Sequence, residues 1–260
     1  MSFLKKLFVV AMALTLVVPG SYATISDANA QSNENANATS NIDSVSGKFE
    51  QMKDTANKSS EIKNSKQIQK LKDISNAAIS SNQVVVNASN SELVIDNAKF
   101  IEIKEEKVKY KTVTIPIVGD QYSFISNLTL IFDSKNSLIS YSETLITKND
   151  NNKFVVTSYS NGNLLQKDET DIDYVSNNTL KKELKVMQNS ANGIVAPQKS
   201  FSKTVLCIST VALIDLTVAR LIAATCVASC PGIPPICAAC IGAVAVVGAG
   251  NLGAIMACFK

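Results

Sequence analysis

The middle of the chain alternates apolar and polar residues with the period of two that a half-buried β-strand requires. Phe100–Ile103 and Val108–Ile115 are the first two such runs, and four more follow. Asn161-Gly162, between the last two runs, tolerates the positive φ angles of a type I′ hairpin turn. We therefore predict an antiparallel β-meander over residues 83–188, forming one curved sheet with a single buried face. The four later runs are residues 124–132, 138–147, 154–159 and 164–170.

The C-terminal segment, residues 204–260, is apolar nearly throughout. Two apolar stretches, residues 205–229 and 236–259, flank a corner that contains prolines at 231, 234 and 235. Because proline cannot continue a helix, the corner predicts a turn between two antiparallel helices. The second stretch carries no charged residue and is long enough to cross a membrane as a helix. The expected fold class is therefore α+β, an antiparallel β-meander pro-domain followed by an apolar α-helical hairpin.

Residues 1–30 have the pattern of an export signal. Lys5 and Lys6 precede the apolar run 7–18, which is too short to span a bilayer comfortably. A small-x-small cleavage site ends at Ala30, ahead of Gln31, and an earlier one ends at Ala23. We predict a cleaved signal peptide and a secreted protein, with an uncleaved membrane anchor as the alternative.

Two polar segments flank the predicted sheet. Residues 31–82 are rich in Asn, Ser and Lys with few apolar positions, which predicts a partly disordered leader with a weak helix, or a solvated linker. Residues 189–203 are rich in Ser, Asn, Gly and Pro and include Lys199 and Lys203. This composition predicts an exposed linker that is accessible to a processing protease.

All six cysteines lie in the C-terminal segment. In an antiparallel hairpin the numbers of facing residues have a nearly constant sum. Pairing the cysteines from the outside inward gives three sums within two of one another. The spacing therefore favours one connectivity among the many that six cysteines allow, and the hairpin is expected to be stapled by disulfides. The predicted bonds are Cys207–Cys258, Cys226–Cys240 and Cys230–Cys237.

Two other interpretations of the cysteines stay open. The pairs Cys226-x3-Cys230 and Cys237-x2-Cys240 have the spacing of a four-cysteine zinc site. The second pair also has thioredoxin-motif spacing, but no βαβ context surrounds it. Export favours structural disulfides, because the extracellular environment is oxidising. We expect neither a metal nor a cofactor.

Two further features of the predicted hairpin have two interpretations each. Small residues recur at every fourth position of its second arm, which suits either helix oligomerisation in lipid or tight packing within the hairpin. Asp215 and Arg220 in the first arm form a polar spot inside an assembly or mark the solvated side of a soluble bundle. The small residues are Ala245, Ala249, Gly253 and Ala257.

Composition narrows the function classes. The chain has no histidine, which removes the usual general base at neutral pH and the commonest metal ligand. Carboxylate- or lysine-based chemistry remains possible, but no motif indicates it, so we do not expect an enzyme. The net charge of +3 is spread over 260 residues, and no basic stripe with interleaved aromatic residues predicts a nucleic-acid partner.

The order of these parts resembles that of a known family. A signal peptide, a strand-rich pro-region and a terminal cysteine-rich apolar peptide with a Cys-Pro corner are typical of halocin-type cysteine-rich bacteriocin precursors of Gram-positive bacteria and archaea. The residues that carry the resemblance are Cys226–Cys240 and the apolar run Ile241–Phe259. The resemblance implies an antimicrobial peptide freed by proteolysis, with the leader as a candidate for self-protection.

These expectations combine into one hypothesis, that the chain is the precursor of a secreted, membrane-active antimicrobial peptide released from its C-terminus. The expected partners are a target-cell membrane, a processing protease, and the protein's own pro-domain or an immunity protein. The low charge of the peptide argues against the electrostatic binding mode of cationic peptides. The alternative is a cell-surface protein whose C-terminal hairpin anchors a ligand- or partner-binding β-domain.

Overall fold

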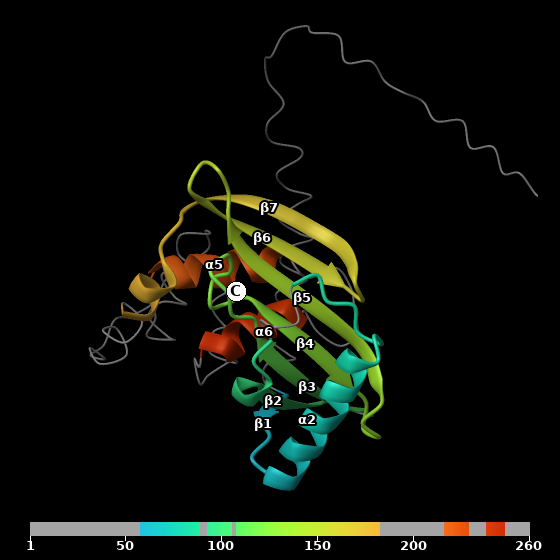
Figure 1. Cartoon of the computed structure of the whole chain (residues 1–260). Coiled ribbons are helices and arrows are strands. Elements are labelled where there is room, and N and C mark those ends of the chain that lie inside the picture. Colours follow the sequence, from blue (N-terminus) through green and yellow to red (C-terminus); the bar gives the residue numbers. More distant parts are fainter. Residues whose placement is uncertain (1–57, 89–92, 106–107, 183–215, 229–237, 248–260) are drawn as a thin grey trace, which may run out of the picture.

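The computed structural model describes residues 58–88, 93–105, 108–182, 216–228 and 238–247 (Figure 1). The predicted signal peptide, about half of the polar leader (residues 31–57), the processing linker, the proline corner and both ends of the C-terminal segment lie outside these ranges.

The described chain forms a seven-stranded antiparallel sheet in which the strands are ordered as they occur in the sequence. The predicted meander is therefore confirmed, and each of the six alternating runs contributes a strand. At the last hairpin, Asn161 and Gly162 have φ angles of 48° and 79°, as a type I′ turn requires. The strands are β1 (Ser59–Glu61), β2 (Lys99–Lys104), β3 (Lys109–Pro116), β4 (Asn127–Phe132), β5 (Leu138–Lys148), β6 (Lys153–Ser160) and β7 (Asn163–Asp173).

One face of the sheet is apolar and is covered by helix α2 (Ser65–Ser80). Asn64 caps the helix, because its side chain accepts a hydrogen bond from the Gln67 amide. Helix α2 and strand β1 thus belong to the sheet unit, which extends N-terminally of residue 83. The buried apolar residues of this core are Leu71 and Ala78 of α2 together with residues of the sheet, among them Val113, Ile115, Leu128, Leu130, Phe132, Tyr141 and Leu145.

The segment after α2 crosses the same face and is fastened by polar side chains of β5. The Tyr141 hydroxyl accepts a 2.9 Å hydrogen bond from the Val85 amide. The Glu143 carboxylate, which is 1% exposed, accepts three more. Their donors are the Asn87 amide at 2.9 Å, the Asn87 side chain at 2.8 Å and the Ala88 amide at 2.8 Å. The short helix η2 (Ile95–Asn97) then leads into β2.

The opposite face is covered by α5 (Leu216–Ala228) and α6 (Ala238–Val247), so the expectation of a single buried face is wrong (Figure 1). The physical reason lies in strands β5, β6 and β7. They carry large apolar residues also at the positions that alternate with those facing α2. Those residues are Ile146, Phe154, Val156 and Ile172. Within the described ranges, neither of these helices, nor any other, has the length and apolar character to cross a membrane.

Candidate functional site: the interface between the sheet and helices α5 and α6

Helix α5 is buried over nearly all of its described side chains. It contacts β6, β7 and α6, and it shares one apolar cluster with Phe154, Val156 and Ile172 of the sheet. Seven of its residues are completely inaccessible to solvent, namely Thr225 and six apolar ones, and burial is the environment that an apolar helix needs in water. The six apolar residues are Val218, Ala219, Leu221, Ile222, Ala223 and Cys226.

Helix α6 lies across β3, β4 and β5. At one end of this contact, the Ile241 side chain packs on Ile103 of β2, with Ile101 and Tyr110 beside it. On its α5 side, α6 adds Ala243, Val244 and Val247 to the cluster that contains Phe154. The sheet therefore shields apolar surface that both C-terminal helices would otherwise expose to water.

A disulfide between Cys226 and Cys240 joins the two helices, with a Cα–Cα distance of 4.5 Å. This bond is the middle one of the three predicted pairs. Because both sulfurs are used in it, neither is available as a thiolate ligand for the alternative zinc site. The four partners of the other two predicted bonds, Cys207, Cys230, Cys237 and Cys258, lie outside the described residues.

At Gly242, helix α6 approaches the sheet so closely that no side chain fits. A Cβ atom at this position would overlap Asn127 Oδ1 and would lie 2.6 Å from Thr129 Oγ1. Both sheet side chains are held in place by hydrogen bonds. Thr129 Oγ1 donates to Asn127 Oδ1 at 3.0 Å, Asn127 Nδ2 donates to the Ile125 carbonyl at 3.0 Å, and Thr114 Oγ1 lies 3.0 Å from Thr129 Oγ1. The sheet thus has a notch that fits the bare backbone of a glycine.

The sheet surface around this notch is polar although it is buried. Asn127 pairs with Thr144 in the register of β4 and β5, and Thr144 pairs with Ser158 in that of β5 and β6. Paired residues of neighbouring strands share a face, so these side chains all lie on the side of α6. We call this the hydroxyl face. It comprises Thr112, Thr114, Asn127, Thr129, Thr144 and Ser158, each at most 1% exposed.

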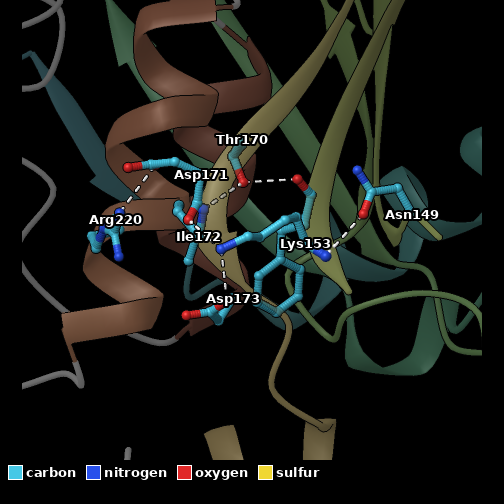
Figure 2. A network of polar contacts seen from close by, with 8 residues as sticks. Asn149, Lys153, Thr170, Asp171, Ile172, Asp173 and Arg220 are labelled. Atoms are coloured by element: carbon cyan, nitrogen blue, oxygen red, sulfur yellow. Dashed lines mark hydrogen bonds and ion pairs between the residues drawn. The ribbon is translucent and has the colours of Figure 1, made fainter. Parts of the chain in front are cut away.

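One ion pair connects α5 to the edge of the sheet among the residues that the structure describes. Arg220 Nη2 donates to Asp171 Oδ1 of β7 at 3.0 Å (Figure 2). The Arg220 side chain is 34% exposed and that of Asp171 is 87% exposed. Arg220 therefore makes a partly exposed contact with the edge of the sheet, which is neither of the two interpretations given for it, and Asp215 lies outside the described residues.

The same edge holds a second ion pair. Lys153 Nζ donates to Asp173 Oδ1 at 2.7 Å and to the Asp171 carbonyl at 3.2 Å (Figure 2). The hydrogen bond from Lys153, and next its positive charge, lower the pKa of the Asp173 carboxyl below the ordinary 3.8, and the charge of Arg220 adds to this. Thr170 Oγ1 donates to the Phe154 carbonyl at 2.7 Å and fixes β7 against β6.

The remaining predicted site residues are placed as follows. Ala245 is half-buried on α6, while Ala249, Gly253 and Ala257 lie outside the described residues, as do Ala30, Gln31, Lys199 and Lys203. Sequence reasoning missed Gly242, its notch and Asp171. One signal was present, because Thr, Ser and Asn occupy alternate positions of four strands, yet this pattern is also typical of a solvent-exposed face.

The described residues contain no group of three or more His, Cys, Asp or Glu side chains that could hold a metal ion. Comparisons with protein-family models, with curated proteins and with solved structures found no match for this chain.

Proposed function

We propose that this chain is the precursor of a secreted, membrane-active antimicrobial peptide, residues 204–260, that is released by proteolysis. The observation that carries the proposal is the burial of α5 and α6 on the sheet. An apolar helix pair that is free in the producing cell would endanger the cell's own membrane. A precursor that covers these helices avoids this danger until the chain is cut.

In this proposal the sheet unit is a masking pro-domain. After export, a protease cuts the linker between about residues 189 and 204, where the chain is polar and rich in Gly and Pro. The released peptide adopts a helical hairpin that is crosslinked by Cys226–Cys240. Two further predicted disulfides, Cys207–Cys258 and Cys230–Cys237, crosslink its open end and its corner. Its apolar stretches then partition into the membrane of a target cell.

The same observation speaks against the alternative of a membrane-anchored β-domain. An anchor must present its apolar surface to lipid, whereas the described side chains of α5 face the sheet and α6. A protein of this alternative kind would have to undock both helices before it could be anchored.

The test is to compare intact secreted protein with the same protein after cleavage in the linker. Leakage of dye from lipid vesicles and growth inhibition of a panel of Gram-positive strains are measured for both. We expect activity only after cleavage, and a free peptide that begins near Phe201–Val205 in mass spectra of the culture supernatant. Full activity of the uncut chain, or an uncut chain bound to the producing cell, would contradict the proposal and support the anchor.

A further inference from the structure

The two faces of the central strands differ in chemistry although both are buried. Toward α2, strands β3 and β4 present Val113, Ile115, Leu128 and Leu130, which is typical of a permanent core. Toward α6, the same strands and their neighbours present the hydroxyl face. Hydroxyl groups gain little from burial, because they exchange hydrogen bonds with water for hydrogen bonds within the protein.

Three hydroxyls of this face are unpaired while α6 is docked. Within the described part of the chain, no hydrogen-bond partner lies near Thr112 Oγ1, Thr144 Oγ1 or Ser158 Oγ. Burying an unpaired hydroxyl is unfavourable relative to leaving it in water. These groups therefore lower the stability of the docked state. Water would satisfy them once the two helices have left this side of the sheet, where α6 contacts β3, β4 and β5 and α5 contacts β6.

The notch at Gly242 makes the hydroxyl face selective for a glycine at this position of α6. Asn127 and Thr129 approach the helix backbone so closely that any residue with a Cβ would have to displace them. Because their hydrogen bonds to each other, to Thr114 and to the Ile125 carbonyl hold these side chains in place, they cannot turn away without losing those bonds.

We propose that the hydroxyl face is a releasable docking site, which accepts α6 only through Gly242 and is built to be hydrated after the helix leaves. The sheet then stays folded on its apolar α2 core, which shares no residue with the α5–α6 cluster. The biological reason for release rests on the proposed function, whereas selectivity and docking strength are properties of the sheet and can be measured without it.

Selectivity is tested in the full-length chain with Gly242→Ala. A helix as short as α6 is marginal by itself in water, so its amide hydrogen exchange reports undocking. We expect exchange in residues 239–247 to rise by roughly tenfold or more, although alanine is the better helix former. The matched control is Ala245→Ser, which adds one heavy atom at a half-buried position of the same helix and should change little.

Rescue separates the notch from a general folding defect. Asn127→Ala removes the atom nearest to a Cβ at position 242, Asn127 Oδ1, and leaves Thr129 Oγ1 in place. We expect the double variant Gly242→Ala/Asn127→Ala to recover part of the protection of α6. Exchange in strands β2 and β3 verifies that the sheet itself is folded in each variant. Unchanged α6 exchange in a folded Gly242→Ala chain would overturn the selectivity of the site.

The second test asks whether the unpaired hydroxyls weaken the docking of α6. It makes the hydroxyl face more apolar with little change of its shape. Thr144→Val with Ser158→Ala removes two unpaired hydroxyls, and a matched change is nearly neutral or stabilising when no partner is lost. We expect α6 exchange to slow by roughly tenfold. The control is Thr157→Val, the same kind of change on the opposite face of β6, which should leave α6 exchange unaltered. Equal or faster exchange in the double variant would contradict the inference.

Vesicle leakage by the cleaved wild-type chain distinguishes this inference from the proposed function. Faster α6 exchange in Gly242→Ala together with no leakage by the cleaved wild type supports the docking site and contradicts the membrane activity. Leakage by the cleaved wild type together with unchanged α6 exchange in Gly242→Ala supports the function and contradicts the docking site.

Discussion

Arg220 of α5 donates a 3.0 Å hydrogen bond to Asp171 of β7, and it connects the C-terminal segment to the sheet by charge. Asp171 is largely exposed, so water and salt screen the pair, and exposed pairs of this kind contribute about 1 kcal/mol or less. We predict that Arg220→Gln and Asp171→Asn each increase α6 and α5 hydrogen exchange only modestly, and non-additively in the double variant. The difference from wild type should disappear in high salt. A large, salt-independent effect would show that the pair contributes more than a surface contact.

Asp173 supplies a prediction with a defined pH dependence. Its pKa is lowered below 3.8, chiefly by the hydrogen bond from Lys153, so the contact stabilises the fold above that value. The contribution is lost as the pH falls through the lowered pKa. Asp173→Asn should therefore lower the Tm at neutral pH by a small amount, and the two Tm curves should converge in strongly acidic solution.

Lys153→Met is the control for this prediction. It removes the hydrogen-bond donor, so adding Asp173→Asn to it should have little further effect on the Tm at any pH. A difference between wild type and Asp173→Asn that is constant from neutral to acidic pH would contradict the assignment of the shift to Lys153.

Strands were predictable because their signals are local. The alternation in residues 108–115 and the Asn161-Gly162 turn depend only on neighbouring residues, and both appear in the structure. Helix α2 was underestimated, because its burial rests on few apolar residues, among them Leu71 and Ala78. Local periodicity gives a weak signal for such a helix, and contact with the sheet stabilises it.

The candidate interface could not be predicted in the same way. Thr112 and Thr114 alternate with valine and isoleucine, which predicts a solvated face. In the structure both are buried, and their strand contacts α6, which lies more than a hundred residues later in the chain. Gly242 resembles any other small residue of the apolar stretch, since its role depends on the position of Asn127. The Cys226–Cys240 bond was predictable, because the hairpin expected from the sequence would constrain residue spacing directly.

The Glu143 carboxylate provides a prediction for the stability of the sheet unit. It accepts hydrogen bonds from two amides and one side chain of Asn87 and Ala88. Glu143→Ala leaves these donors without their acceptor and should destabilise the fold by about 3 kcal/mol. Glu143→Gln keeps one acceptor oxygen and should have an intermediate effect. Urea denaturation measures both, with the change Glu61→Ala at an exposed position as a control. An effect of Glu143→Ala no larger than that of the control would show that the hydrogen bonds to Asn87 and Ala88 do not stabilise the fold.

The disulfides give the sharpest prediction about the peptide itself. Cys207–Cys258, predicted from the hairpin spacing, would close a loop of about fifty residues and should contribute on the order of 4 kcal/mol by restricting the unfolded chain. Cys230–Cys237 closes a much shorter loop and should contribute less. Replacing Cys207 and Cys258 together by Ser should therefore reduce the Tm and protease resistance of the peptide more than replacing Cys230 and Cys237.

Peptide mapping of the non-reduced protein tests the connectivity on which this comparison depends. The bond between Cys226 and Cys240 limits the four remaining cysteines to three arrangements, each of which gives a different set of linked fragments. Antiparallel helices favour the nested arrangement, because Cys207 and Cys258 then meet at the open end and Cys230 and Cys237 meet beside the proline corner. Fragments that link Cys207 to Cys230 or to Cys237 would mean that the first arm folds back on itself, and the hairpin would then be the wrong structure for the released peptide.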